Sequence, residues 1–403
     1  MRSKHRFIMV GFFVLTILGP LPILAQEKGR ELSLPRAIEI ALERSPLLQA
    51  ARYQVEAAVA GVDRARASLL PKLDVRESFT RADNPVFAFS SKLNQGRFTQ
   101  ADFDVNRLNH PEATSNFQTN LSFAQPIYTG GKASIGFEQA KLHREATVQG
   151  FDRTRQEVIF QVAKAYYRVL LARADLEAVK SAIQAAEANR DLALARFKAG
   201  LVVESDVLSA DVRLSSLKEQ GIIAQNQLIL AQAALNDVMG LPLEEPFEIK
   251  DRLKERPARS GRLEELERLA LTRRPDYQRL GFEERALDLG VALARAEFLP
   301  ILRATAGYEL NHLSFAANGQ DSWFVGIVLQ WNLFNGLEDR AKVAEAKARF
   351  GEIHAQRVRM RSGIKLEVKD AFLTLKAAEE RIGVAKRAVT QAEESLRIVK
   401  DRY

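Results

Sequence analysis

The sequence contains no cysteine among its 403 residues. This absence excludes disulfides, cysteine-based metal sites and a lipid anchor attached to cysteine. After residue 25, no segment reaches the run of about 18 apolar residues that a membrane-spanning helix needs. Any part of the mature chain that crosses a bilayer must therefore do so with β-strands, since only helices and closed sheets satisfy the backbone in lipid.

Blocks of one charge sign and clusters of chemically active side chains are also missing. The formal net charge is +8, but the basic residues alternate with Glu and Asp. We interpret them as solvated helix faces, so no nucleic-acid partner is expected. The segment TGGKAS resembles a phosphate loop, but Pro126 stands where that motif has its first glycine. The histidines are scattered without metal-ligand spacing: His5, His110, His143, His312 and His354. We expect no enzyme activity, cofactor or metal.

Residues 1–25 have the composition of a secretory signal peptide. They combine the basic start RSKHR, an apolar run from Phe7 to Leu18 and the small residue Ala25. The mature chain is therefore expected to leave the cytoplasm.

A stretch near the start of the chain returns later without a gap. Pro46 and Pro71 recur as Pro275 and Pro300, both at an offset of 229 positions. A repeat of this length predicts one structural unit used twice. We divide the chain into a first repeat, residues 26–245, and a second repeat, residues 246–403.

Long helices dominate the prediction. No proline occurs from Lys132 to Lys198, which predicts one helix over 131–198 that could span roughly 100 Å. A return helix is predicted over 203–239, and the proline-containing residues 240–260 after it are predicted to be a linker between the halves. A second long helix is predicted over 337–403. Helices of such length indicate a coiled coil or helical barrel rather than a globular core.

In each repeat there is a region, at about 72–125 and 301–334, where apolar residues fall at every second position. This alternation predicts one β-hairpin in each repeat. Residues 81–115 are polar and predict a long loop within the first hairpin. Pro71, Pro126 and Pro300 mark the helix–strand junctions. One face of the strands is predicted to be apolar and lipid-facing: Phe117, Leu121, Phe123, Trp323, Val325, Ile327, Leu329, Trp331 and Leu333.

Four strands cannot close a membrane barrel, because known single-chain barrels start at about 8 strands. Three copies of this chain would give 12 strands with room for a lumen. The predicted fold class is therefore mainly α with a small β part, in which two hairpins contribute four strands to a trimeric 12-stranded barrel. The alternative is a soluble coiled-coil protein or periplasmic adaptor with exposed hairpins, which leaves the Trp323–Leu333 alternation unexplained.

The order of these segments resembles the TolC-like outer-membrane efflux protein family. The resemblance lies in QPIYTGG before the long helix, in AGLVVESDVL at its end, and in FAFSSKLNQGRFTQADF of the first loop. It implies a homotrimer in the outer membrane of a Gram-negative cell that extends into the periplasm. It further implies a passive duct for efflux or type I secretion, docked to a periplasmic adaptor and an inner-membrane transporter of the RND or ABC class.

The resemblance also assigns a contact site at the helix break after Lys198. Gly200, Leu201, Val202, Val203 and Asp206 match the tip that meets the adaptor. An ordinary helix–helix turn remains the alternative, since glycine is expected there in any case.

The second repeat aligns with the first only up to Tyr403, which matches Phe197. In the family, the acidic residues that narrow the periplasmic entrance would fall beyond residue 403. We expect either a truncated sequence or a protein without part of this gate and without its closing helix.

Overall fold

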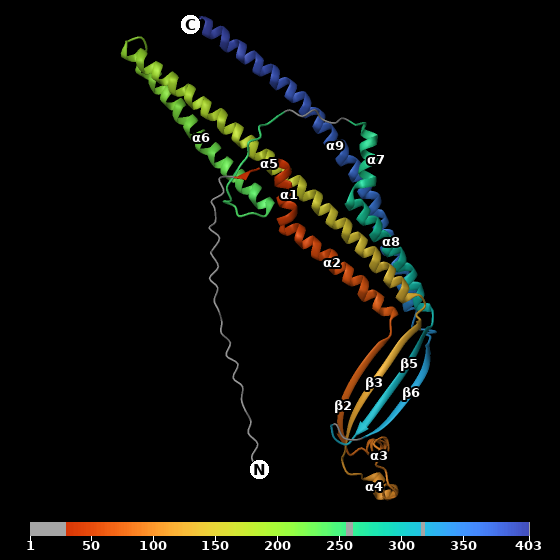
Figure 1. The fold of residues 1–403 in the computed structure, drawn as a ribbon. Helices are drawn as coiled ribbons and strands as arrows, with labels where there is room; N and C mark the ends of the chain where they lie inside the picture. Colours follow the sequence, from red (N-terminus) through yellow and green to blue (C-terminus); the bar gives the residue numbers. More distant parts are fainter. Residues whose placement is uncertain (1–29, 255–260, 316–318, 403) are drawn as a thin grey trace, which may run out of the picture.

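A computed structural model describes residues 30–254, 261–315 and 319–402 of the chain. The signal peptide predicted for residues 1–25 lies outside the described residues. The long helices run side by side along most of the molecule, and one curved sheet extends from their end (Figure 1). In the described part of the chain, no helix has the length and apolarity to cross a membrane.

Helices make up most of the fold, as predicted. In chain order they are α1 (Leu34–Arg44), α2 (Pro46–Arg66), α3 (Pro85–Asn94), α4 (Val105–Asn109), α5 (Lys132–Lys198), α6 (Glu204–Met239), α7 (Leu263–Arg273), α8 (Pro275–Arg295) and α9 (Glu338–Arg402). Three short 3₁₀ turns are η1 (Ala67–Leu69), η2 (Gln100–Phe103) and η3 (Ala296–Phe298). The strands are β1 (Arg30–Glu31), β2 (Lys72–Ala82), β3 (Thr114–Tyr128), β4 (Phe247–Glu248), β5 (Ile301–His312) and β6 (Gln320–Gln330).

The two long helices form where the sequence predicts them. Helix α5 has 67 residues and α9 has 65. A run without proline lets the backbone hydrogen bonds continue from turn to turn, and α5 stops only where a glycine takes a left-handed backbone conformation. Helix α5 begins after Gly131 and ends before Gly200, both with positive φ.

The two predicted hairpins join into one antiparallel sheet with the order β2-β3-β5-β6. Strand β3 of the first hairpin pairs with β5 of the second, from Phe117 opposite His312 to Tyr128 opposite Leu302. The outer edges of the sheet are β2 and β6. Each chain therefore carries a four-stranded sheet with two open edges.

The entries into β2 and β5 have the same geometry. Each preceding helix ends in a 3₁₀ turn, after which Leu70 and Leu299 adopt extended backbone angles. The N–H of each leucine donates to the carbonyl oxygen three residues earlier, at 3.2 Å in both cases. Pro71 and Pro300 then begin the extended segment, so these two predicted junctions are helix–strand junctions in the structure.

The predicted end of the last strand was wrong. Strand β6 ends at Gln330, so Trp331 and Leu333 lie beyond the ladder. The final pair is Ile301 with Gln330, because β5 starts only after Pro300 and offers no further partner. Instead, the indole Nε1 of Trp331 donates to the carbonyl oxygen of Phe298 at 3.0 Å.

Pro126 does not end its strand, which continues to Tyr128. The ladder to β2 stops earlier, at Ala124 opposite Lys72, so the other edge of β3 is unpaired at Pro126. The register to β5 shifts between Pro126 and Tyr128. A proline is tolerated at such a bulge because no ladder hydrogen bond needs its missing N–H.

Two further predictions need correction. Residues 81–115 are not a structureless loop, since they contain the end of β2, helices α3 and α4, and the start of β3. The segment predicted as a linker after Met239 contains β4, which pairs in parallel with β1. Because β1 and β4 have only two residues each, no alternating pattern could reveal them.

The main buried core lies in the first repeat, where α1, α5 and α6 meet. Its fully buried side chains include Val162, Tyr166, Leu235 and Met239. The hydroxyl of Tyr166 donates to Oδ2 of Asp251 at 2.7 Å and lies 3.2 Å from the carbonyl oxygen of Leu32. Burial, with the nearby Asp251 carboxylate, raises the pKa of Tyr166 above its ordinary value.

Candidate functional site

The sheet has one apolar face, to which all four strands contribute. Side chains of directly paired residues lie on the same face of a sheet. Leu121 pairs with Val75 on one side and with Tyr308 on the other, and Tyr308 pairs with Trp323. The larger apolar members of this face are Leu73, Val75, Phe79, Phe117, Leu121, Phe123, Leu302, Tyr308, Leu310, Trp323, Val325, Ile327 and Leu329. One row near the outer end of this face is polar apart from Leu310, and it holds Glu77, Thr119 and Asp321.

This apolar face is open in the single chain. Trp323, Val325 and Ile327 are 75%, 73% and 70% exposed. Their burial would remove apolar area from water at about 25 cal/mol per Å². An exposed apolar band of this kind on a surface marks a site that contacts lipid or another protein. Of the residues predicted to face lipid, all except Trp331 and Leu333 lie on it.

The opposite face of the same sheet is polar. One row across it consists of Arg76, Asn120, Glu309 and Ser322, each paired with the next. Neighbouring rows add Lys72, Asp74, Ser78, Gln118, Ser122, Arg303 and Asn311. The sheet thus separates an apolar side from a side that water can wet.

At the far end of the helices, α5 and α6 are joined by a tight turn. The N–H of Gly200 donates to the carbonyl oxygen of Phe197, and that of Leu201 to Arg196, both at 2.9 Å. This pair of bonds is a Schellman motif, which needs a left-handed residue. Gly200 supplies it with a φ of +73°.

The predicted contact residues surround this turn and project from it. Leu201 is 73% exposed and Val203 is 62% exposed, while Val202 is half-buried. Asp206 lies in the first turn of α6, and its Oδ2 accepts a bond from the N–H of Val203 at 3.4 Å. Two apolar side chains at the end of a rigid helical hairpin offer a small contact surface, and nothing in the turn itself requires them.

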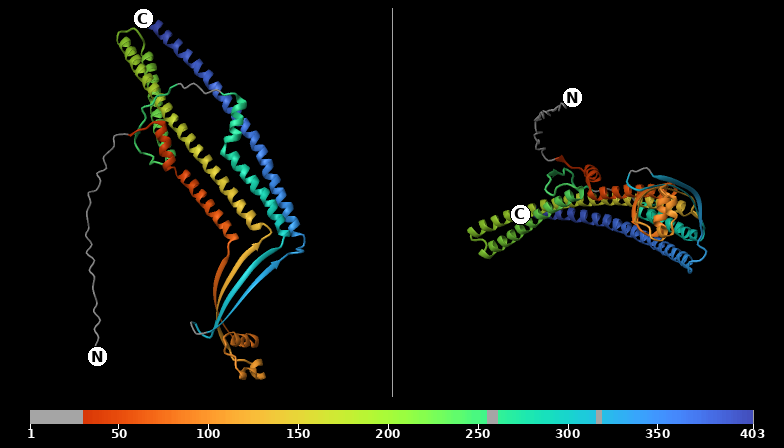
Figure 2. Two further views of the ribbon diagram at one scale, coloured as in Figure 1. Left: turned by 45° about the vertical axis from the view of Figure 1, so that its right-hand side comes forward. Right: turned by 90° about the horizontal axis from the view of Figure 1, so that it is seen from below.

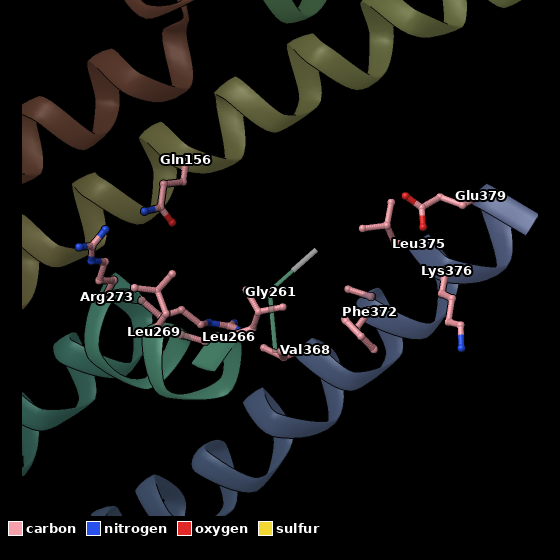
Figure 3. Close-up of a pocket in the computed structure, with 13 residues that line it drawn as sticks. Gln156, Gly261, Leu266, Leu269, Arg273, Val368, Phe372, Leu375, Lys376 and Glu379 are labelled. Atoms are coloured by element: carbon pink, nitrogen blue, oxygen red, sulfur yellow. The ribbon is translucent and has the colours of Figure 1, made fainter. Parts of the chain in front are cut away.

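An apolar groove lies midway along the helices, between α7 and α9 and beside α5. Its volume is about 780 Å³. Leu266 and Leu269 of α7 face Val368, Phe372 and Leu375 of α9 across it (Figure 3).

A cluster of charged residues joins α8 to α9. It was not predicted from the sequence. The carboxylate of Glu284 on α8 is buried, and accepts a bond from Arg357 and one at 2.7 Å involving Nδ1 of His354. Burial acts to raise the pKa of Glu284, but the bonds to His354 and Arg357 outweigh it and hold the pKa below its ordinary value. With the offset of 229 for α8, and with the offset of 206 for α9 that also relates Tyr403 to Phe197, these three residues align with Val55, Val148 and Phe151 of the first repeat. A comparison of the two repeats position by position could have identified them.

A second charged cluster precedes this one on α8. Arg274 donates to both carboxylate oxygens of Asp276, at 3.1 and 2.6 Å, and also to Glu367 of α9. The side chains of Arg274 and Asp276 are 19% and 16% exposed. These two clusters fasten the α8–α9 pair along its length.

Known proteins share both the sequence and the fold of this chain. The outer membrane efflux protein family matches residues 37–241 and 266–403. The alkaline protease secretion protein AprF of Pseudomonas aeruginosa is 26% identical over 346 residues, which cover 84% of this chain and 68% of AprF. The outer membrane protein TolC of Vibrio cholerae is 24% identical over 308 residues, 73% of this chain and 64% of TolC. The chain thus spans about two thirds of the length of these relatives.

The fold is that of the crystal structure of the outer membrane protein VceC from Vibrio cholerae. The TM-score is 0.75 at 22% identity, over 92% of this chain and 85% of VceC. The outer-membrane channel MtrE of Neisseria gonorrhoeae, solved in an open state, gives a TM-score of 0.67 at 21% identity, over 92% and 79% of the two chains. With the family match across both repeats, these findings establish that the chain belongs to the outer membrane efflux protein family.

Proposed function

We propose that this chain is the protomer of a homotrimeric export duct that crosses the outer membrane and the periplasm. The observation that carries the proposal is the single sheet with one apolar and one polar face. In a bilayer the apolar face contacts lipid and the polar face lines a water-filled lumen. The long helices then continue the lumen through the periplasm.

The two open sheet edges support a trimer. Unpaired backbone groups on β2 and β6 would cost several kcal/mol each in lipid. When β6 of one copy pairs with β2 of the next, three copies close a barrel of 12 strands without any edge. The strand pairs within one chain leave β2 and β6 as the two unpaired edges, which makes them the natural partners between copies.

The exposed surface of the chain also supports assembly. Large apolar side chains are exposed along the long helices, among them Leu171, Ile222 and Leu230. The apolar groove between α7 and α9 is also open in the single chain. Packing against a neighbouring copy would bury it.

We further propose that the α5–α6 tip docks a periplasmic adaptor, which links the duct to an inner-membrane transporter of the RND or ABC class. Gly200 shapes the turn, Leu201 and Val202 provide the apolar contact, and Val203 and Asp206 fix the start of α6. The duct itself is passive, and the transporter supplies the energy. The names of the relatives include both secretion and efflux proteins, so either cargo route fits this architecture.

The trimer is tested by the mass of the purified protein in detergent. Light scattering with correction for bound detergent should give three chains per particle. A monomer or dimer of full-length, folded protein would contradict the proposal.

The tip is tested by Leu201→Asp and Gly200→Pro in cells that depend on the adaptor for export. Proline cannot adopt the positive φ at position 200, and aspartate at 201 places a charge in the apolar contact. Trimers should form in normal amounts, while export falls at least about tenfold, the effect of losing about 1.4 kcal/mol of contact energy. The control is Leu243→Asp, an exposed leucine beyond the other end of α6. Unchanged export by both tip variants would remove the tip assignment.

A further inference from the structure

The segment between β2 and β3 folds into a compact unit, which we call the outer cap and define as residues 83–113. Asn84 caps α3, because its Oδ1 accepts a bond from the N–H of Phe87 at 3.1 Å. Aromatic rings from three parts of the cap pack edge to face: Phe89 on Phe98 at 4.7 Å, and Phe98 on Phe103 at 5.1 Å. The outer cap therefore has a small core of its own.

An ion pair closes this unit. Nζ of Lys92 lies 2.8 Å from Oδ1 of Asp102, and the two side chains are 27% and 12% exposed. The other oxygen of Asp102 accepts bonds from the N–H and hydroxyl of Thr99. The bond to Lys92, followed by those from Thr99, holds the pKa of Asp102 well below its ordinary value. The carboxylate thus stays ionised, and the ion pair with Lys92 is kept, at physiological pH.

Gln95 fastens the outer cap to the sheet. Its side-chain nitrogen lies 2.8 Å from the carbonyl oxygen of Ser115, 2.8 Å from Oδ1 of Asn116, and 3.2 Å from the carbonyl oxygen of His312. Asn116 in turn donates to Oδ1 of Asn311 at 2.8 Å. Gln95, Asn116 and Asn311 are only 6%, 8% and 2% exposed. One glutamine side chain thereby connects the cap to β3 and, across it, to β5.

The contact continues to the edge strand β6. A Cβ built on Gly96 would lie 3.8 Å from the Cβ of Gln320 and 2.4 Å from its Oε1. Gln320 pairs with Asn311, and Asn311 pairs with Gln118, so all three lie on the polar face. The outer cap thus reaches from β3 to β6 across the polar side of the sheet's outer end. The cap lies at and beyond the outer ends of the strands (Figure 1), and seen from below it projects within their arc (Figure 2, right).

We propose that the outer cap constricts the outer mouth of the duct and so limits what passes through it. The inference rests on the proposed function, since the polar face lines the lumen only in a closed barrel. In that barrel each copy places one cap inside the mouth, so three caps converge there. Gln95 is the residue that holds each cap in the lumen.

Single-channel conductance in planar lipid bilayers tests the constriction. Gln95→Ala removes the bonds to Asn116 and to the carbonyl groups of Ser115 and His312, so the cap is released and the conductance should rise at least about twofold. The matched control is Gln100→Ala, the same substitution at an exposed position of the same cap, which should leave the conductance unchanged.

A disulfide between cap and sheet provides a second, reversible measurement. The pair Gly96→Cys and Gln320→Cys has a Cβ separation of 3.8 Å, the usual value for a disulfide, and the chain has no other cysteine. Added to Gln95→Ala, the oxidised pair should restore the low conductance, and a reducing agent should raise it again. A high yield of the disulfide would show separately that the cap lies on the sheet.

The outcomes separate the two proposals. If the unmodified protein opens no channels, the duct itself is wrong. If it opens channels, but Gln95→Ala and the reduced triple variant conduct like the unmodified protein, the constriction is wrong and the duct stands. If the disulfide forms in folded trimers but the oxidised triple variant conducts no less than Gln95→Ala, the constriction is equally overturned.

Discussion

In each repeat a shorter helix packs on a long one, α2 on α5 in the first and α8 on α9 in the second. Aligned positions in these two helix pairs hold apolar residues in the first repeat and charged residues in the second. In the first repeat Val55, Val148 and Phe151 occupy positions that Glu284, His354 and Arg357 take in the second. The first repeat has a buried apolar core around Val162 and Leu235, whereas the second is fastened by charged clusters at Glu284 and Asp276. The same backbone scaffold is therefore compatible with apolar and with ionic helix packing.

Apolar and ionic helix packing contribute to the stability of the fold in different ways. Apolar burial stabilises the first repeat at any pH, because no charge has to be matched. A buried carboxylate stabilises only while its partners remain and while it stays ionised. Four predictions follow the comparison, each measured as a change in unfolding free energy or midpoint of the purified protein in detergent.

The largest effect is expected in the apolar core of the first repeat. Leu235→Ala should lower the free energy of unfolding by about 2–5 kcal/mol, since a fully buried leucine leaves a cavity. Urea-induced unfolding, followed by circular dichroism, measures it. Leu208→Ala, an exposed leucine on the same helix, is the control and should cost less than about 1 kcal/mol. Equal losses would mean that this core does not dominate the stability of the first repeat.

A smaller loss is expected when one partner of the ionic cluster is removed. Arg357→Ala leaves the buried Glu284 carboxylate with His354 alone and should cost about 1–2 kcal/mol, since the 37% exposure of Arg357 limits the effect. Arg349→Ala removes an exposed ion pair on the same helix and is the control. If it costs as much as Arg357→Ala, burial of the Glu284 cluster has no energetic significance.

A still smaller net change is expected when the whole cluster is replaced by its counterparts from the first repeat. The variant Glu284→Val, His354→Val, Arg357→Phe removes every charge together, so no buried charge is left without a partner. Such replacements are often neutral or stabilising, and the change should stay within about 1 kcal/mol of zero. A loss larger than that of Arg357→Ala would show that the two repeats are not interchangeable at these positions.

The smallest effect is expected in the response to acid. The pKa of Glu284 lies below its ordinary value in the folded protein, so its stabilisation is present at neutral pH. It is lost as the pH falls from the ordinary glutamate value, about 4.3, through the lower folded value. Unfolding midpoints between about pH 6 and pH 3 should therefore fall more steeply for the unmodified protein than for the triple variant. Parallel curves would contradict the linkage.

The fold follows from the sequence wherever a pattern is long. The absence of proline from Lys132 to Lys198 defines α5, and the alternation from Trp323 to Leu329 places β6 and its apolar face. Alternation fails as a guide to strand ends, because the ladder stops where the partner strand begins. The residue opposite Trp331 would be Pro300, which precedes β5. Trp331 and Leu333 therefore continue the alternation without a partner in the ladder.

Short elements and long-range side-chain contacts were not predicted from the sequence. Asn84 before Pro85 and the Thr99–Asp102 spacing are capping signals, but the polar composition of residues 81–115 concealed them. Gln95 could not be predicted to reach His312, 217 residues away, because the contact depends on pairing between the two hairpins. Such contacts become visible only once β3 lies beside β5.

The central claim is that one sheet face contacts lipid and the other lines water. Asn120 and its neighbour Leu121 lie at one depth on opposite faces of β3. Since the chain has no cysteine, Asn120→Cys and Leu121→Cys each provide a single reactive site. In intact outer membranes, a small water-soluble maleimide should label Cys at position 120 quickly and leave position 121 unlabelled. Equal labelling at the two positions, or labelling of position 121 alone, would contradict the account.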